Sequence, residues 1–352
     1  MGHLEARLMH VLVTGHRGYI GGLLVPRLQA AGHQVTGADS DLYRGCDFGR
    51  HVPPRETRAT DIRDITVADL EGFVAVIHLA GLSNDPLGDL DPELTDAINT
   101  RATLRLADAA RSAGVARFLF SSSCSNYGAS ATGDWLTEDA PLNPVTPYAV
   151  SKVEAEAGLD GLAGDGFSPV FLRSATAYGV SPRIRFDLVV NNLTAWAMAT
   201  GQVRLKSDGS AWRPLVHVAD IAHAFECALT APRDRVHRHA FNVGRNEDCM
   251  QIRTLAEKVR DTVPGTKICF ASDAGADRRT YRVDCSKIAG IGFTPRWQVE
   301  SGIAELRDAL RAMPVPVDAF EGPRFGRVAH IRQALADGRL DAELRPAASA
   351  MA

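Results

Sequence analysis

The chain has 352 residues, 45% of them hydrophobic and 23% charged, with a formal net charge of −3. This composition is that of a globular protein and excludes a collagen-like or disordered chain. The small net charge gives no overall positive field, so neither nucleic acid nor a membrane is expected as a partner. No apolar run reaches the ~18 residues of a membrane span, and the first residues lack the apolar core of a signal peptide, so we expect a cytoplasmic protein. The six cysteines are scattered without a C-x-x-C pair, and no metal site is expected.

Short apolar strands alternate with longer helical patterns in the first half of the chain. Strands are predicted at 11–13, 34–38, 73–80 and 118–120, and helices at 19–31, 92–113 and 148–162. Nearly continuous apolar strands separated by helices are typical of a parallel sheet that is covered on both faces.

The pattern becomes less regular after about residue 175. Helices are predicted at about 186–200, 218–230, 251–261, 299–312 and 329–336, and short strands at 203–205, 215–217 and 241–243. This half is expected to extend the sheet and to form a smaller lobe.

A glycine-rich turn, Thr14–Gly21, lies between the first predicted strand and the helix that follows it. Its glycines, Gly15, Gly18 and Gly21, would let backbone N–H groups approach a pyrophosphate at the helix N-terminus. Asp39 ends the second predicted strand, at the spacing expected of an acid that accepts hydrogen bonds from an adenosine ribose. A carboxylate there would repel a 2′-phosphate, so the two features favour NAD over NADP.

A second constellation joins Ser123, at the end of a predicted strand, with Tyr148 and Lys152. Residues four apart share one face of a helix, so the Lys152 ammonium is expected near the Tyr148 phenol. A nearby positive charge lowers the pKa of a phenol and makes it a better base. Ser123 can hydrogen-bond the same substrate hydroxyl.

From about Val11 to Leu310 the chain resembles the extended short-chain dehydrogenase/reductases, specifically the NAD-dependent nucleotide-sugar epimerase/dehydratase branch. The motifs that carry the resemblance are Thr14–Gly21, Asp39, Asp61–Arg63, His78–Gly81, Ser121–Ser123 and Tyr148 with Lys152. The resemblance implies an α/β fold with a doubly wound Rossmann parallel sheet and a smaller C-terminal substrate-binding lobe. We predict an NAD-binding domain with the catalytic residues over 9–175, a mainly substrate-binding lobe interleaved with the sheet over 176–315, and a C-terminal extension over 316–352.

The resemblance also assigns residues to each part of the site. Ser123, Tyr148 and Lys152 match the catalytic triad. The expected cofactor-binding residues are Gly15, Arg17, Gly18, Tyr19, Ile20, Gly21, Asp39, Asp61, Ile62, Leu79, Ala80, Gly81, Asn99, Ser121, Tyr148 and Lys152. The expected substrate-binding residues are Ser83, Cys124, Ser125, Thr176, Asn192, Arg213 and Arg278. Asn192 and Arg213 match positions that hold the substrate diphosphate, with the Asn191 side chain as the alternative to Asn192. Arg278 and Arg279 lie slightly later than the second phosphate-binding arginine of the family, which aligns with Ala274.

The two residues after Ser123 bear on the type of reaction. The 4,6-dehydratases of this branch have an Asp-Glu pair there, whereas this chain has Cys124 and Ser125. Neither is a good acid–base group at its ordinary pKa, so dehydration by the usual route is disfavoured. Cys124 could donate a proton if its surroundings tuned it, or could simply pack beside the sugar.

The resemblance therefore implies an enzyme that epimerises a nucleotide-activated sugar through a transient keto intermediate. The keto group is expected at C4. One alternative is a nucleotide-sugar dehydrogenase or ketoreductase that releases a keto or reduced sugar. Another is a non-catalytic NAD-binding regulator on the same fold. The family also implies a homodimer formed by the helices predicted at 92–113 and 148–162.

Overall fold

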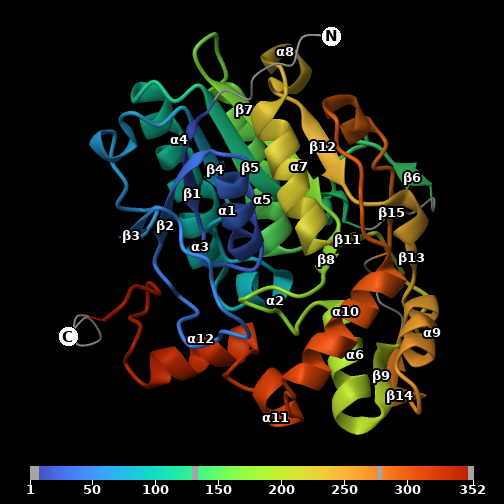
Figure 1. The fold of residues 1–352 in the computed structure, drawn as a ribbon. Coiled ribbons are helices and arrows are strands. Elements are labelled where there is room, and N and C mark those ends of the chain that lie inside the picture. Colours follow the sequence, from blue (N-terminus) through green and yellow to red (C-terminus); the bar gives the residue numbers. More distant parts are fainter. Residues whose placement is uncertain (1–7, 129–133, 276–279, 348–352) are drawn as a thin grey trace.

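The computed structural model describes residues 8–128, 134–275 and 280–347. A parallel sheet of seven strands lies at its centre, in the order β12-β7-β5-β4-β1-β2-β3 (Figure 1). These strands are β1 (His10–Thr14), β2 (Gln34–Asp39), β3 (Glu56–Ala59), β4 (Ala75–His78), β5 (Arg117–Ser123), β7 (Ser168–Ser174) and β12 (Ala240–Val243). The sheet and the helices on both of its faces confirm the predicted α/β class and doubly wound parallel architecture.

Two pairs of helices cover the sheet. The helices α1 (Gly21–Ala30) and α7 (Val218–Thr230) pack on one face, where Leu24, Leu28 and Phe225 join an apolar core. The helices α4 (Ala102–Ser112) and α5 (Pro147–Gly161) pack on the other face, around a core that includes Leu106 and Leu159. Because helices bury both faces, inner strands such as β4 are buried along their whole length.

The helix predicted at 92–113 is not continuous. It consists of α3 (Pro92–Asp96), one π-helical turn at Ala97–Arg101, and α4. The π turn contains Asn99, whose buried side-chain amide accepts from Leu82 N at 2.8 Å and donates to Leu82 O at 3.0 Å. The widened turn thus fixes the loop that follows β4.

The second half of the chain contributes both to the main sheet and to a smaller lobe. The strand β12 enters the sheet beside β7, while α6 (Val189–Thr200), α9 (Ile252–Thr262) and α10 (Val299–Ala312) surround a separate apolar core. Small two-stranded pairings complete the lobe: β9 (Gln202–Ser207) with β14 (Lys267–Gly275), β8 (Thr176–Tyr178) with β11 (Leu215–His217), β10 (Trp212–Arg213) with β13 (Met250–Gln251), and β6 (Trp135–Leu136) with β15 (Arg282–Val283). The short helices α2 (Asp85–Gly88) and α8 (Arg233–Val236) lie in connections.

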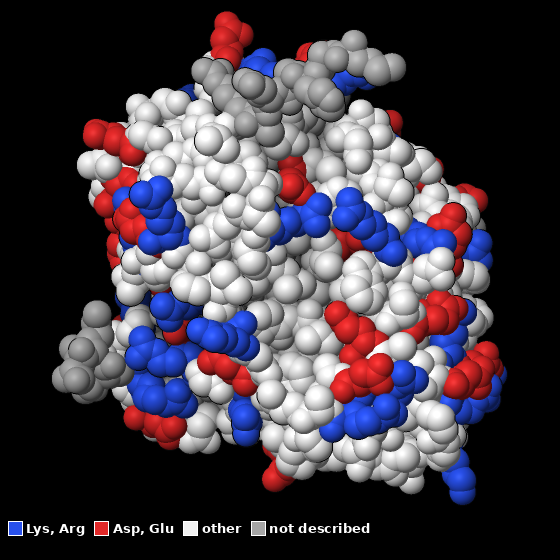
Figure 2. Space-filling model, viewed as in Figure 1, with Lys and Arg blue, Asp and Glu red and all other residues white. Residues whose placement is uncertain are grey.

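After α10 the chain continues through α11 (Val317–Phe320) and α12 (Arg327–Ala336), which run along the lower edge of the molecule in Figure 1. Positive and negative side chains are interspersed over the face in Figure 2, without one continuous patch of either sign. Within the described part of the chain, no helix is both long and apolar enough to cross a membrane.

A buried ion pair joins the sheet to α5. Arg173 on β7 contacts the carboxylate of Glu156 at 2.6 Å, and both side chains are less than one-tenth exposed. The same carboxylate accepts hydrogen bonds from Ser122 at the end of β5 and from Asn126, the latter at 3.1 Å. The pair therefore holds β5, β7 and α5 together just below the strand ends.

Removing the carboxylate of this pair should destabilise the fold strongly. We expect Glu156→Ala to lower the free energy of unfolding by about 3–5 kcal/mol, because Arg173 would remain buried without its anion. Equilibrium unfolding in urea measures the change. Asp160→Ala is the matched control on α5, since its pair with Arg238 is exposed and should contribute at most about 1 kcal/mol. Equal losses in the two variants would contradict the assignment.

Candidate active site

The glycine-rich turn packs closely against the end of β4. Gly15 has a φ of +71°, and a Cβ at that position would lie 2.7 Å from Ala80 N. A Cβ on Gly21 would lie 2.5 Å from Gly15 O, and Gly18 N donates to the same oxygen at 3.0 Å. Only glycine fits these contacts, and the resulting backbone cradle at the start of α1 suits a pyrophosphate.

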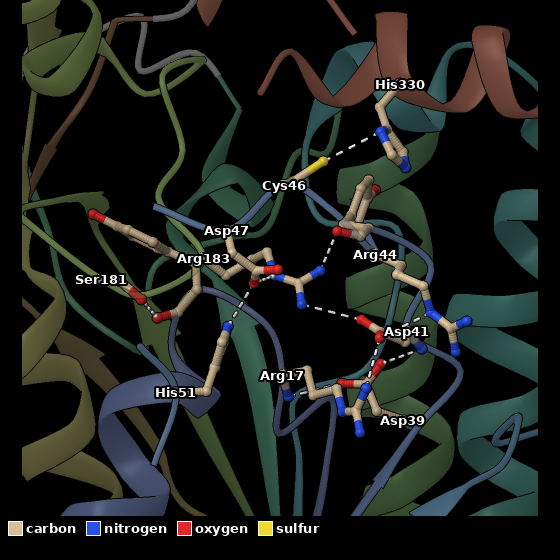
Figure 3. Close-up of polar contacts among 12 residues, drawn as sticks. Arg17, Asp39, Asp41, Arg44, Cys46, Asp47, His51, Ser181, Arg183 and His330 are labelled. Atoms are coloured by element: carbon tan, nitrogen blue, oxygen red, sulfur yellow. Dashed lines mark hydrogen bonds and ion pairs between the residues drawn. The ribbon is translucent and has the colours of Figure 1, made fainter. Parts of the chain in front are cut away.

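Asp39 lies at the end of β2 and faces this turn (Figure 3). Its two carboxylate oxygens accept the backbone N–H groups of Arg17 and Asp41, each at 2.8 Å. These bonds fix the orientation of the carboxylate, and its remaining lone pairs can accept two ribose hydroxyls. These two acceptor oxygens therefore fit the ribose hydroxyls in the adenosine half of NAD.

A cavity of about 180 Å³ lies between the glycine-rich turn, Asp39 and the loop after β4. Most of the predicted cofactor-binding residues line it: Gly15, Arg17, Gly18, Tyr19, Ile20, Gly21, Asp39, Asp61, Ile62, Leu79, Ala80 and Gly81. Ser121, Tyr148 and Lys152 line a larger cavity of about 840 Å³ that shares Ile20, Leu79 and Gly81 with the first. The two cavities are therefore adjacent, which suits a cofactor that meets a substrate.

Asn99, predicted to contact the cofactor, lines neither of the two cavities. It is 1% exposed, and its amide is bonded to Leu82 and to Ser151 Oγ. A Cβ on Gly81 would lie 2.8 Å from Asn99 Oδ1. Asn99 thus positions the loop that lines the cavity, because its own polar atoms are used within the protein.

Ser123, Tyr148 and Lys152 come together on the wall of the larger cavity. Tyr148 and Ser123 form a side-chain hydrogen bond, and Ser125 N donates to Ser123 Oγ at 3.1 Å. Lys152 lies one turn after Tyr148 on α5, and its ammonium donates to Ser121 O at 2.9 Å. The Lys152 Nζ is 5.8 Å from the centroid of the Tyr148 ring. The arrangement offers a phenol, a hydroxyl and a cation to one substrate hydroxyl.

Burial changes the pKa of both titratable groups. It raises the pKa of Tyr148 above the ordinary value, although the hydrogen bond from Ser123 and the charge of Arg185 oppose the rise. The expectation of a lowered tyrosine pKa is therefore wrong for the protein without ligands, because desolvation exceeds the effect of nearby cations. Burial also lowers the pKa of Lys152 to about 8, while the Glu156 carboxylate opposes this change.

The larger cavity is lined by five of the predicted substrate-binding residues: Ser83, Ser125, Thr176, Asn192 and Arg213. Asn191, the alternative to Asn192, is fully buried and uses its amide on Gly179 N at 2.9 Å and Arg185 O at 2.9 Å. Arg278 lies outside the described residues. The guanidinium of Arg213 lies 5.8 Å from the ring centroid of Tyr281, which lines the same cavity.

Cys124, predicted to contact substrate, does not line this cavity. It is 1% exposed, and its thiol donates to Arg173 O at 3.1 Å. Burial raises its pKa far above the ordinary range, so the thiol is neutral and cannot supply a thiolate. Ser125, one residue later, is the member of the pair that lines the cavity.

The C-terminal extension contributes a carboxylate that sequence reasoning missed. Glu321 lines the larger cavity and accepts from Asn192 Nδ2 at 3.2 Å and from Trp196 Nε1 at 2.9 Å. Asn192 Nδ2 also donates to Phe186 O at 2.9 Å, so both amide hydrogens are used within the chain. A diphosphate at Asn192 would have to displace Glu321.

Arg185 is a second residue that sequence reasoning missed, and it lines both cavities. Its guanidinium pairs with Asp187 at 2.7 Å and donates to Ser83 Oγ at 3.1 Å. No motif marked this arginine, which reaches the site only through the fold.

Comparison with known proteins agrees with this geometry. Residues 11–244, two thirds of the chain, match the model of the NAD dependent epimerase/dehydratase family. A UDP-glucose 4-epimerase of Mycolicibacterium smegmatis is 30% identical over 318 residues, covering 86% of this chain and 99% of the relative. A dTDP-glucose 4,6-dehydratase of an Actinoplanes species is also 30% identical over 318 residues, covering 84% and 96%. The solved structure of MoeE5 in complex with UDP-glucose and NAD is 27% identical, with a TM-score of 0.74, and covers 86% of this chain and 99% of its own.

The chain belongs to the NAD-dependent epimerase/dehydratase family, as the resemblance predicted. Its cofactor is NAD, as predicted, and the cradle, Asp39 and the adjoining cavities fit that group. Relatives named as epimerases and as dehydratases match at the same identity. The family is therefore one of nucleotide-sugar enzymes, and its members are epimerases or dehydratases.

The lowered pKa of Lys152 makes stability depend on pH. The unfolded chain holds the lysine proton up to about pH 10.5, whereas the folded protein loses it near pH 8. Between these values the unfolded state binds more protons, so the free energy of unfolding rises with pH. We expect NAD-free protein to gain on the order of 2–3 kcal/mol relative to Lys152→Met across this range.

Urea unfolding of both proteins from pH 7.5 to 10 tests this. Lys287→Met, which removes an exposed lysine, is the control and should show no such trend. If the difference in the free energy of unfolding between the unaltered protein and Lys152→Met stayed constant with pH, Lys152 would have an ordinary pKa.

Proposed function

We propose that the chain is an epimerase that inverts one carbon of a nucleotide-activated sugar through a transient keto sugar. The observation that carries the proposal is the meeting of Ser123, Tyr148 and Lys152 on the wall of the larger cavity, which adjoins the cofactor cavity, with no Asp-Glu pair directly after Ser123. A cavity of about 840 Å³ is within the range that small-molecule sites occupy.

Tyr148 acts as the base that removes a proton from a sugar hydroxyl, which we assign to C4. Ser123 aligns that hydroxyl through its hydrogen bond with the phenol, and the Lys152 ammonium stabilises the phenolate. Bound NAD supplies a hydride acceptor at its nicotinamide and a positive charge in its oxidised form. After the keto sugar turned over in the cavity, Tyr148 would return the proton to the sugar oxygen, and bound NAD, which would supply both hydride acceptance and hydride return, would end unchanged.

Epimerisation is favoured over dehydration by the carboxylates that the cavity contains. Among the described residues that line it, the acids are Asp85, Asp187 and Glu321, and none of them occupies the two positions directly after Ser123. Asp85 accepts from Thr146 at 2.7 Å, and Asp187 is paired with Arg185. The loss of a sugar hydroxyl needs a proton donor beside it, and the position where the dehydratases carry theirs holds the buried Cys124.

Nucleotide sugars are the proposed substrates, because the relatives are named for UDP-glucose and dTDP-glucose and one structure holds UDP-glucose. Arg213, on the wall of the larger cavity, is proposed to bind the diphosphate, since a guanidinium matches phosphate oxygens in pairs. The homodimer, the cytoplasmic location and the domain boundaries remain predictions.

Incubation with UDP-, dTDP-, GDP- and CDP-hexoses in deuterated water tests the reaction. We expect a product of unchanged mass with one inverted carbon and no carbon-bound deuterium, because the hydride never exchanges with solvent. Mass spectrometry and proton NMR measure both. A product lighter by water would instead identify a dehydratase, and one lighter by two hydrogens with stoichiometric NADH would identify a dehydrogenase.

The variant Tyr148→Phe removes the proposed base. We expect kcat to fall by about 10²–10⁴-fold, the usual contribution of a positioned acid–base group, while NAD remains bound. Val150→Ala, at a partly exposed position on the same helix, is the control and should keep its rate. If Tyr148→Phe turned over normally, the phenol would not be the base. A protein with bound NAD, no turnover, and an unaltered biological effect in this variant would be a regulator.

A further inference from the structure

The C-terminal extension lies against the cofactor cavity as well as the substrate cavity. Arg327 and Leu344 line the cofactor cavity, far from the family match that ends at residue 244. Ile331, Ala334, Leu340 and Leu344 pack with Leu82 and Leu87, which belong to the loop and helix after β4. At the far end, Arg345 pairs with Asp64 at 2.6 Å, close to Asp61. The extension is therefore anchored on both sides of the cavity.

Arg327 differs from the other arginines of this cavity. Five arginines line it: Arg17, Arg63, Arg183, Arg185 and Arg327. The first four pair with carboxylates of Asp41, Asp61 or Asp187 at 2.6–3.1 Å. Within residues 8–128, 134–275 and 280–347, no carboxylate lies within ion-pair distance of Arg327. Among the five arginines of this cavity, Arg327 is therefore the one whose charge no carboxylate of the described residues neutralises.

The guanidinium of Arg327 is also incompletely hydrogen-bonded. The residue is 3% exposed; its Nη2 donates to Arg183 O at 3.3 Å, while its buried Nη1 has no acceptor among the described residues. The guanidinium lies over the Tyr43 ring at 3.9 Å from the centroid, and Tyr43 lines the same cavity. This stacking fixes the plane of the cation and leaves its edge for another acceptor.

The loop after β2 holds this arrangement in place (Figure 3). Arg183 donates to Tyr43 O and pairs with Asp41, and Cys46 Sγ contacts Nδ1 of His330 on α12 at 3.2 Å. Arg327, the first residue of α12, is therefore held beside this loop.

A buried, unpaired guanidinium is costly, and burial lowers the pKa of Arg327 accordingly. A guanidinium carries only donors, so its best partner is an anion with paired oxygens, and phosphate is such a group. NAD brings one anionic group, its pyrophosphate, to this cavity. We propose that Arg327 is a cofactor-binding residue that donates to the pyrophosphate of NAD, so that the C-terminal extension completes the cofactor site.

Titration of NAD-free protein with three ligands tests the proposal without any sugar substrate. In Arg327→Met the side chain keeps a similar length but loses its charge and donors. We expect the Kd for NAD and for ADP to rise about 10- to 100-fold, the range of charge-assisted hydrogen bonds, while the Kd for adenosine, which has no phosphate, stays the same. Isothermal titration calorimetry measures all three.

Thermal unfolding provides the second readout. Removing an unpaired buried cation should leave the Tm of the NAD-free protein equal or higher, while the increase in Tm caused by NAD becomes smaller. A merely structural arginine would instead lower the Tm of the NAD-free form. Arg332→Met removes an exposed arginine from the same helix and is the matched control, expected to change neither quantity.

Arg327→Lys retains the charge and should keep part of the affinity for ADP, which also covers the case in which Arg327→Met fails to fold. Unchanged NAD and ADP affinities in both variants would overturn the proposal. An equal loss for adenosine would overturn it too, because it would show that Arg327 shapes the adenosine end and does not contact the pyrophosphate. None of these outcomes depends on the epimerase reaction, so the two proposals fail separately.

Discussion

The buried pair of Glu156 and Arg173 is the constraint on which the catalytic geometry depends. Ser123 ends β5, whereas Tyr148 and Lys152 lie on α5, and their relative position is set by what joins the strand to the helix. The Glu156 carboxylate does this by accepting from Ser122, one residue before Ser123, and from Arg173 on the neighbouring strand. Because Glu156 lies one turn after Lys152, the same carboxylate also favours the charged lysine. A structural ion pair therefore supports both the placement and the protonation of the site.

Much of the site follows from patterns that are local in sequence. The glycine-rich turn, Asp39 and the serine-rich end of β5 each come directly after a buried apolar strand, and parallel strands bring their carboxyl ends to one edge of the sheet. This is why residues from the turn, β2, β4 and β5 could be placed beside one another before the structure was known. The strand β3 was missed because its sequence, Glu-Thr-Arg-Ala, is mostly exposed at the sheet edge and has no apolar pattern. The strand β7 was not predicted either, although it is buried.

The parts that could not be predicted depend on contacts between distant segments. No motif marks Arg185, Glu321 or Arg327 themselves, and each reaches a cavity only because the lobe and the extension fold back onto the sheet. Asn99 and Cys124 are the opposite case, because they were expected to contact cofactor and substrate and yet line neither cavity. Both stand next to true cavity residues in sequence, yet the π turn and the start of the turn after β5 direct their side chains into the protein. Alignment with a motif therefore located the neighbourhood but not the direction of each side chain.

The extension also links the two halves of the site. Phe320, Glu321 and Gly326 line the substrate cavity, and Arg327, the next residue, lines the cofactor cavity. The substrate side of this segment presents a carboxylate where a diphosphate is proposed to bind, whereas the cofactor side presents an arginine without a carboxylate partner among the described residues. An anion is thus repelled on one side and attracted on the other. One short segment, from Phe320 to Arg327, therefore carries groups of opposite charge that line the two cavities.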